Sequence, residues 1–213
     1  MYLSRLTLNL RSREARRDAN SSYELHSTLM RLFANVPKEM ERMLFRCDCR
    51  DGSTTVLIQS RTKPDFAALP QGYCTDMKCR DDYAEKLNTL QVGQQLRFRL
   101  TANPTRKVWI PQPNGEKHPT RSPLHLPDQQ EKWLRRKMTD GGADVITFSI
   151  ERQTTRRNTK RGEKANQKEQ IHVPVLFEGV LMIKNRVSFL HLVEGGIGSA
   201  KGYGFGLLSL APA

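Results

Sequence analysis

A tyrosine and a histidine stand three residues apart in the segment SSYELHSTLMRLF, at the start of an expected helix. Tyr23 and His26 then lie along one side of that helix, partly off its apolar face. The positive end of the helix dipole disfavours a charged imidazolium, whereas a bound phosphate favours it. His26 is therefore a candidate for proton transfer near neutral pH, with Tyr23 beside it. The alternative is that His26 is a structural residue next to the apolar stripe.

A glycine-rich segment, EGGIGSAKGYGFGLLSLAP, is the second place where the sequence could do chemistry. It is not a nucleotide-binding P-loop, because the pattern G-x-x-x-x-G-K-[ST] is absent and the loop precedes a strand. Two G-x-G pairs remain, separated by five residues and made of Gly196, Gly198, Gly204 and Gly206. Such glycines let backbone N–H groups approach a phosphate, and Lys201 between them adds positive charge. A tight turn without a ligand is the alternative.

The stretch RQTTRRNTKRGEKANQK, residues 152–168, holds seven Lys or Arg residues and one Glu between two strand-like segments. We expect a basic hairpin or loop here that follows RNA phosphates, with a solvated run of charge as the alternative. The whole chain of 213 residues has a formal net charge of +13. This excess of positive charge favours a polyanion as the partner, most often a nucleic acid and otherwise an anionic membrane surface.

The cysteine, histidine and carboxylate residues are not spaced as in known metal sites. Cys47, Cys49, Cys74 and Cys79 fit no common structural zinc pattern, so we expect reduced thiols. The histidines show no ligand spacing and the carboxylates do not cluster, so we expect no metal and no other cofactor. No apolar run approaches the ~20 residues of a membrane span, and the N-terminal residues do not form a signal peptide. We therefore expect a cytoplasmic protein.

The elements that must position these residues follow from hydrophobic periodicity. Period-two alternation and turn signals predict strands at 2–10, 43–50, 53–60, 95–104, 143–151, 171–185 and 205–212. Helices are expected at 22–36, where Ser21 and Glu24 form a capping box, at 128–142, opened by Asp128 and closed by glycines, and at 187–196. Residues 103–127, rich in proline and basic residues, are expected to form a surface loop.

The order of these elements approximates strand, helix, strand, strand, helix, strand, repeated twice. A helix of the first repeat between residues 64 and 92 is weakly indicated, and residues 11–22 read as a polar connection. The expected fold class is α+β, with two tandem ferredoxin-like (RRM-like) domains built on antiparallel sheets. Residues 1–92 are expected to form the first domain, which carries His26, and residues 93–213 the second, which carries the basic hairpin and the glycine loop.

Four segments together resemble the CasE-type CRISPR RNA-processing endoribonucleases, the repeat-cleaving subunits of Cascade effector complexes. They are YLSRLTL, RRDANSSYELHSTL, LRFRLTANPTRK and VLFEGVLMI followed by GGIGSAKGYGFGLLSLAP. The resemblance runs essentially end to end, and its most specific parts are the start of the YELH helix and the glycine loop. It implies tandem ferredoxin-like domains, cleavage of a CRISPR repeat hairpin without a metal ion, and retention of the product.

The resemblance also implies site residues. His26 and Tyr23 match the histidine and tyrosine that lie at the scissile phosphate in that family. Gly196, Gly198, Gly204 and Gly206 match its glycine loop, and Arg156, Arg157 and Lys160 match a basic hairpin that binds the RNA stem. Ser27 departs from the pattern, because some relatives have a basic residue after the histidine.

The expected reaction is attack of an RNA 2′-OH on its own adjacent phosphate, which gives a 2′,3′-cyclic phosphate and a 5′-OH. His26 is then the general base or the general acid, and Tyr23 orients the reacting groups. The expected partners are the CRISPR repeat RNA, the mature guide RNA and the other Cascade subunits, with no membrane. Two alternatives stay open: a non-catalytic module that binds RNA hairpins, and a basic structural protein of a ribonucleoprotein.

Overall fold

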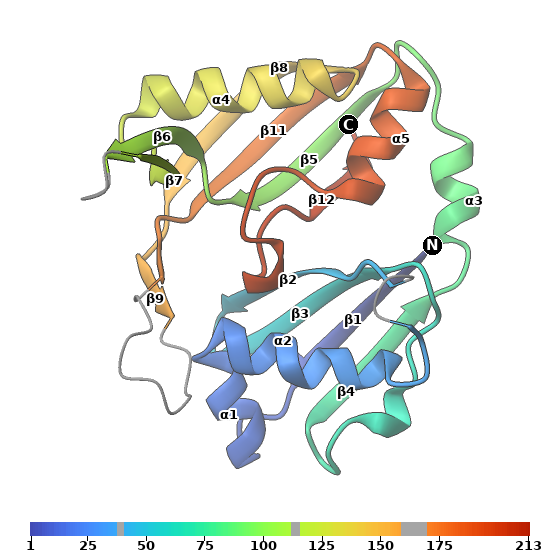
Figure 1. Ribbon diagram of the computed structural model, residues 1–213. Coiled ribbons are helices and arrows are strands. Elements are labelled where there is room, and N and C mark those ends of the chain that lie inside the picture. Colours follow the sequence, from blue (N-terminus) through green and yellow to red (C-terminus); the bar gives the residue numbers. More distant parts are fainter. Residues whose placement is uncertain (38–40, 112–115, 159–169) are drawn as a thin grey trace.

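The computed structural model describes residues 1–37, 41–111, 116–158 and 170–213. Its first half is built on a four-stranded antiparallel sheet in the order β2-β3-β1-β4 (Figure 1). The elements of this half are β1 (Tyr2–Leu8), α1 (Arg13–Ala19), α2 (Ser22–Met30), the 3-10 turn η1 (Arg31–Phe33), β2 (Leu44–Arg50), β3 (Ser53–Ser60), the 3-10 turn η2 (Phe66–Ala68) and β4 (Cys74–Arg80).

The second half repeats this plan on a sheet in the order β12-β5-β11-β8, again fully antiparallel. Its elements are β5 (Gln95–Ala102), α4 (Pro127–Asp140), β8 (Ala143–Arg152), β11 (Val175–Ile183), α5 (Arg186–Gly195), the 3-10 turn η3 (Lys201–Tyr203) and β12 (Leu208–Pro212). In both sheets the first strand of the repeat lies between the fourth and the third. This shared order is that of two tandem ferredoxin-like domains, so the expected fold class is confirmed.

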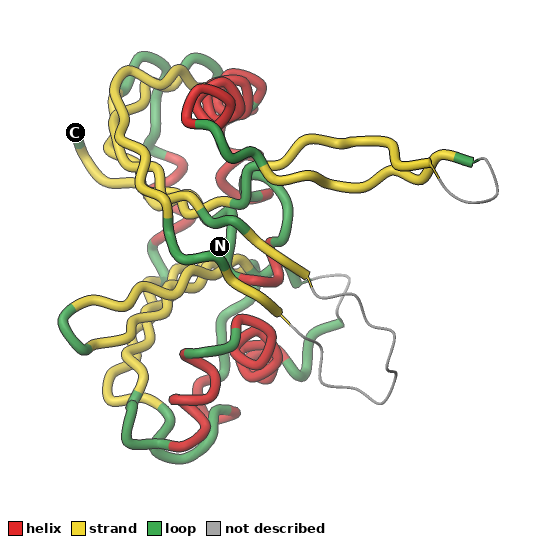
Figure 2. The backbone as a smooth tube through the Cα atoms, turned by 90° about the vertical axis from the view of Figure 1, so that its left-hand side faces the viewer, coloured by secondary structure: helices red, strands yellow, loops and turns green. Residues whose placement is uncertain are grey.

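Two hairpins are added to the second half. One pairs β6 (Thr105–Pro111) with β7 (Lys117–Pro123), and Figure 2 shows it extending away from the body of the molecule. The expectation of a surface loop at 103–127 was therefore wrong. Proline and basic residues suggested a loop, but a two-stranded ribbon outside the main sheets tolerates proline at its edges. The other hairpin pairs β9 (Arg156–Asn158) with β10 (Gln170–His172), at the two ends of the predicted basic segment.

The helix that carries His26 begins as expected. Ser21 is the N-cap, and its Oγ accepts a hydrogen bond from the backbone N–H of Glu24 at 3.4 Å. The regular helix ends at Met30, earlier than the expected residue 36, because the chain tightens there into the 3-10 turn η1. The preceding helix α1 was missed: it buries only Ala15 and Asp18, so its sequence carries no apolar stripe.

Other elements differ in part from the expectation. Between residues 64 and 92, where one helix was weakly indicated, the structure has the short turn η2, the strand β4, which was not expected, and the helix α3 (Tyr83–Asn88). The helix α4 begins at Pro127 with Leu126 as its N-cap, so Asp128 lies in the first turn and does not open the helix. Proline is well suited to a first helical position, because its missing N–H would have no helical partner there.

Each half has its own buried apolar core. In the first, Leu6, Leu25, Leu29, Phe45 and Ile58 are at most 2% exposed. The second core contains Phe98, Leu134, Phe177, Phe189 and Leu208, together with Tyr83 and Leu87 of the linking helix α3 (Tyr83–Asn88). The domain boundary near residue 92 stays a prediction. Among the described helices none is long and apolar enough to cross a membrane.

Polar contacts connect the two halves directly. The buried Arg46 of β2 donates a hydrogen bond from Nη1 to Ser209 Oγ of β12 at 2.7 Å. Gln59 Nε2 of β3 donates to the backbone oxygen of Val193 at 2.9 Å. These bonds hold the C-terminal segment against β2 and β3, and with it the glycine-rich loop between α5 and β12.

Candidate active site

The glycine-rich loop reaches the helix that carries His26. Its central turn η3 contacts both α2 and β2 (Figure 1). A methyl group placed on the Cα of Gly202 would lie 3.9 Å from His26 Nε2. Two segments that the sequence indicated separately, about 175 residues apart along the chain, therefore form one site.

His26 is half-buried at this contact. Its ring stacks on Phe45 of β2, with centroids 5.9 Å apart and planes 20° apart. The Nδ1 atom is buried and has no hydrogen-bond partner among the described residues. Burial lowers the pKa of His26 below its usual value of 6.5. The imidazole is therefore neutral near pH 7, and in that form one ring nitrogen can accept a proton.

Two tyrosines come from the two elements that meet at this site, α2 and η3. Tyr23, on the same helix, is 36% exposed. Tyr203 comes from η3; burial raises its pKa, and the electrostatic effect of Tyr23 adds to this shift. The ring of Tyr203 also packs against His172 of β10, with centroids 4.7 Å apart. The two elements that meet at this site, α2 and η3, therefore carry one exposed and one half-buried phenol.

The four predicted glycines of the loop all adopt the left-handed backbone region. Their φ angles are +70° for Gly196, +84° for Gly198, +81° for Gly204 and +89° for Gly206. A Cβ at Gly206 would lie 2.5 Å from the backbone oxygen of Ile197, and one at Gly204 would lie 3.0 Å from the ring of Phe45. These glycines thus shape the loop and let it pack closely; their contact with RNA stays a prediction.

Lys201 is held within the loop. Its Nζ donates a hydrogen bond to the backbone oxygen of Gly195 at 2.6 Å. Burial lowers the pKa of Lys201, and the nearby positive charges of Arg42 and Lys137 lower it further. A cation that is partly dehydrated and surrounded by like charge is stabilised by an anion. The expectation that Lys201 faces a phosphate remains a prediction.

The basic hairpin is described only in part. Arg156 and Arg157 are in β9, where they pair through the backbone with His172 and Ile171 of β10. Lys160 lies outside the described residues. The strand–strand pairing agrees with a hairpin at the ends of the basic segment, and the contact of these three residues with an RNA stem stays a prediction.

No three side chains of His, Cys, Asp or Glu gather as a metal site within the described ranges. The four cysteines form no disulfide. Burial raises the pKa of Cys74 to about 11, so this group is a thiol near neutral pH.

Sequence reasoning missed Phe45, Gly202 and Tyr203 as parts of the site. Phe45 is separated from His26 by 18 residues and belongs to another element, so no local spacing indicates their contact. The sequence does carry a usable signal for Tyr203: it is an aromatic residue between Gly202 and Gly204, within the glycine-rich segment.

Comparisons with known proteins agree with this architecture. The sequence model of a family described as "CRISPR associated protein" matches residues 1–212. The chain is 34% identical over 223 residues to the CRISPR-associated endoribonuclease Cse3 of Thermus thermophilus, with 100% of both sequences covered. It is also 34% identical over 220 residues to the CRISPR system Cascade subunit CasE of Escherichia coli, again with 100% of both covered.

A solved structure shows the same fold. The structure of CRISPR endoribonuclease Cse3 bound to a 19-nucleotide RNA matches with a TM-score of 0.84 and 33% identity, covering 100% of each chain. Sequence and fold thus agree over the whole length, including the helix of His26 and the glycine loop. The chain therefore belongs to the CasE-type family of CRISPR-associated proteins.

Proposed function

We propose that this protein is an endoribonuclease that binds the repeat hairpin of CRISPR precursor RNA, cuts it, and keeps the guide RNA as a subunit of Cascade. Its relatives are named for RNA cleavage and for Cascade, and one of them has been solved with RNA bound. The observation that carries the proposal is the contact between the glycine loop and His26, in which Gly202 lies next to the Nε2 atom of the ring.

The reaction that fits this site is internal transesterification of RNA. The 2′-OH beside the scissile phosphate attacks the phosphorus, the bond to the 5′-oxygen breaks, and the products carry a 2′,3′-cyclic phosphate and a 5′-OH. One proton leaves the 2′-oxygen and one is added to the 5′-oxygen. His26 serves one of these transfers, because its ring is partly exposed: the neutral imidazole that burial favours can accept the proton of the 2′-OH, and the protonated ring can give one to the 5′-oxygen.

The other groups bind and orient the RNA. Tyr23 is exposed enough for its hydroxyl to hydrogen-bond the reacting nucleotide. Lys201 and the basic residues Arg156, Arg157 and Lys160 supply positive charge for the phosphates. The loop is shaped so that its backbone passes close to the RNA strand, and the residues that allow this shape are Gly196, Gly198, Gly204 and Gly206. Proton transfer contributes about 10²–10⁴-fold to such a rate, so alignment of the nucleotide supplies much of the remainder.

The reaction in this proposal needs no metal ion, because the RNA supplies its own nucleophile and His26 handles a proton. The test is incubation of the repeat hairpin RNA with excess protein in EDTA, followed by analysis of the product ends. We expect a 2′,3′-cyclic phosphate on one product and a 5′-OH on the other. A 3′-OH and a 5′-phosphate, or cleavage that appears only after Mg²⁺ is added, would contradict the proposal.

The second candidate is a non-catalytic module that binds RNA hairpins. The setting of His26 speaks for catalysis, because its Nδ1 has no hydrogen bond to protein among the described residues, unlike a typical structural histidine. Tight binding of the repeat hairpin without cleavage would favour the second candidate. Equal competition by an unrelated hairpin would favour a general structural protein of a ribonucleoprotein.

A further inference from the structure

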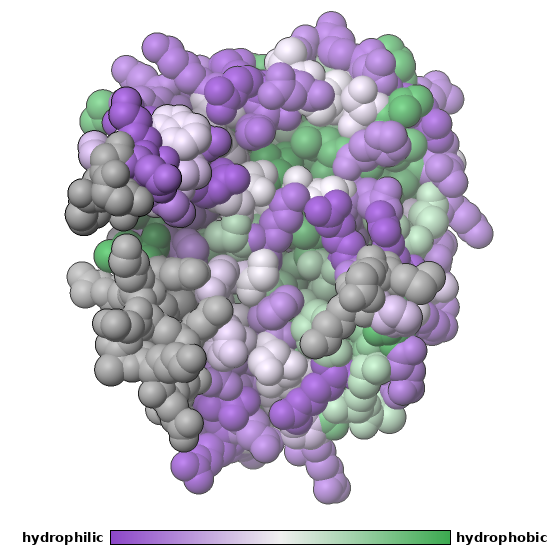
Figure 3. All heavy atoms as spheres, in the orientation of Figure 1, coloured by the Kyte–Doolittle hydropathy of each residue, from purple (hydrophilic) through white to green (hydrophobic). Residues whose placement is uncertain are grey.

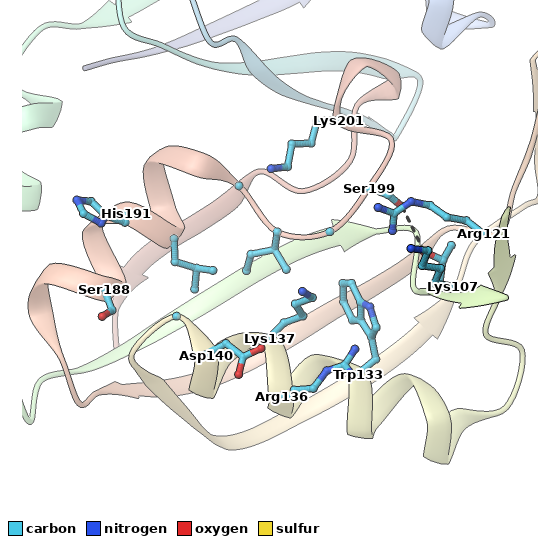
Figure 4. A pocket seen from close by; sticks show the side chains of 16 residues that line it. Lys107, Arg121, Trp133, Arg136, Lys137, Asp140, Ser188, His191, Ser199 and Lys201 are labelled. Carbon is cyan, nitrogen blue, oxygen red and sulfur yellow. Dashed lines mark hydrogen bonds between the residues drawn. The ribbon is translucent and has the colours of Figure 1, made fainter. Parts of the chain in front are cut away.

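A cavity of about 730 Å³ lies on the other side of the glycine loop from His26. It is bounded by α4, α5, the β6–β7 hairpin and the loop itself. Figure 4 shows Lys137 of α4 and Lys201 of the loop among the side chains that line it, with Lys107 and Arg121 at the hairpin end. In Figure 3 the same region is a hollow with apolar residues at its floor and hydrophilic residues around it.

The charge that lines this cavity is strongly unbalanced. Five basic side chains face it against the single carboxylate of Asp140; they are Lys107, Arg121, Arg136, Lys137 and Lys201. In the part of the chain that the structure describes, none of the five forms an ion pair. Other basic residues on the surface do have a carboxylate partner, as Arg61 does in Glu194. Unpaired like charges around one hollow repel each other until an anion occupies it.

The size and shape of the cavity favour single-stranded RNA over an RNA duplex as the bound anion. A hollow of this volume accepts a ligand on the scale of a nucleotide. An A-form duplex presents a convex outline, with its phosphates on the rims of a groove, and lies across the mouth of such a hollow without filling it. A strand that has left the duplex can turn its phosphates inward.

The position of the cavity ties it to the cut. Lys201 lines the cavity, and the next residue, Gly202, lies against His26. Consecutive Cα atoms are only about 3.8 Å apart, so a single stretch of the loop backbone contributes to both the cavity and the His26 site. Attack of the 2′-OH in line with the departing 5′-oxygen requires the nucleotide at the cut to leave regular helical geometry. A site that holds the strand just outside the helix therefore also serves the reaction.

We propose that this basic cavity binds the phosphates of single-stranded RNA adjoining the scissile phosphate, separately from the surface that holds the hairpin stem. The inference rests on the proposed function and adds a second RNA-binding surface to it. The single strand could come from the RNA beyond the cut or from the opposite strand at the base of the stem. Both sources present the same phosphodiester chemistry, and the experiment separates them.

The experiment measures the affinity of the full chain for three RNA probes. All carry a 2′-deoxy nucleotide at the cut, so that none is cleaved. One is the repeat hairpin alone, one is extended by a few single-stranded nucleotides past the cut, and one is extended equally at the opposite strand of the stem. The proteins are the wild type, a double variant with Arg136→Gln and Lys137→Gln, and a control with Lys78→Gln on β4, an exposed lysine outside the cavity.

We expect one extension to tighten binding to the wild type and to the Lys78→Gln control by about tenfold. The double variant should lose that gain and bind the hairpin alone within about twofold of the wild type. The slope of log affinity against log salt should also fall by about 0.7 for each phosphate that the double variant no longer neutralises. The probe that shows the gain identifies which single strand enters the cavity.

Three results would overturn the inference: no gain from either extension, a gain that survives in the double variant, or an equal loss for all three probes, which would assign the cavity to the stem. Failure of the proposed function is separate from these. In that case the wild type would leave the unmodified repeat hairpin, which has its 2′-OH at the cut, uncleaved, whatever the three probes show.

Discussion

The ring of Phe45 touches both parts of the candidate active site. It stacks on His26, and a Cβ on Gly204 would meet it at 3.0 Å. Phe45 is 1% exposed and comes from β2, so the first sheet sets the position of the imidazole and of the loop together. The arrangement of the site therefore depends on the packing of the second half, which carries the loop, against the first half, which carries His26 and Phe45.

Replacement of this ring should disturb His26 more than it disturbs the fold. We expect Phe45→Leu to slow single-turnover cleavage by about tenfold or more, because a misplaced catalytic group forfeits alignment. The variant should also move the inflection of the pH–rate profile that belongs to His26 to higher pH, since water that enters around His26 weakens the cause of its lowered pKa.

Phe33→Leu is the matched control for this test. Phe33 is 3% exposed in the same core, and its replacement leaves the His26–Phe45 stack in place. Equal loss of cleavage in both variants would mean that Phe45 acts only through the stability of the core.

The pH dependence of stability should report the burial of His26. Its pKa is lowered in the folded state by burial, so the unfolded chain binds its proton at a higher pH. The free energy of unfolding should therefore be constant with respect to His26 above its usual pKa of 6.5. It should decline as the pH falls from 6.5 to the lowered pKa of the folded state. Comparison of the wild type with His26→Asn by urea unfolding, at a series of pH values, measures this contribution. Parallel curves would show that His26 titrates normally in the fold.

Two glycines at the ends of the glycine-rich loop should respond oppositely to replacement by alanine. Gly206 has φ +89° and no room for a Cβ, so we expect Gly206→Ala to cost about 1–3 kcal/mol in the free energy of unfolding. Gly195 ends α5 with nothing within 4 Å of a Cβ, so Gly195→Ala should be neutral or stabilising by up to about 1 kcal/mol. The midpoints of urea denaturation of the two variants and the wild type measure these changes. An equal shift of the midpoint in both variants would contradict the loop geometry.

A buried carboxylate supports α1, the helix before the one that carries His26. Asp18 is 1% exposed; it forms an ion pair with Arg17 at 2.7 Å and accepts a hydrogen bond from the hydroxyl of Tyr73 at 2.8 Å. We expect Tyr73→Phe to cost about 1.5–3 kcal/mol of stability, because the lost bond goes to a charged acceptor.

Tyr83→Phe provides the comparison. Its hydroxyl donates to the neutral Gln59 Oε1 at 3.3 Å, so its loss should cost only about 0.5–1.5 kcal/mol. A larger loss for Tyr83→Phe than for Tyr73→Phe would show that Asp18 is not the strong acceptor of this core.

Periodicity predicted the elements that contribute to a core. Leu96, Phe98 and Leu100 alternate in the sequence and are all buried in β5, and the Asp51–Gly52 turn joins β2 to β3 as expected. The β6–β7 hairpin was not predictable in this way, because its exposed residues, such as Trp109, pack on no core and leave no period.

The candidate site shows the same division. Capping chemistry and glycine spacing indicated His26 and the loop separately. Their contact could not be predicted from spacing, because it depends on bonds between the halves such as Arg46 to Ser209. The roles of Arg156 and Arg157 and the cytoplasmic location stay predictions.

The central claim is that His26 carries the chemistry of RNA cleavage. The most direct measurement is single-turnover cleavage of the repeat hairpin RNA by the wild type and by His26→Ala, with binding of the same RNA measured in parallel. We predict a rate reduced by about 10²–10⁴-fold in the variant, with affinity within a few-fold of the wild type. Cleavage at an undiminished rate by His26→Ala would contradict this account.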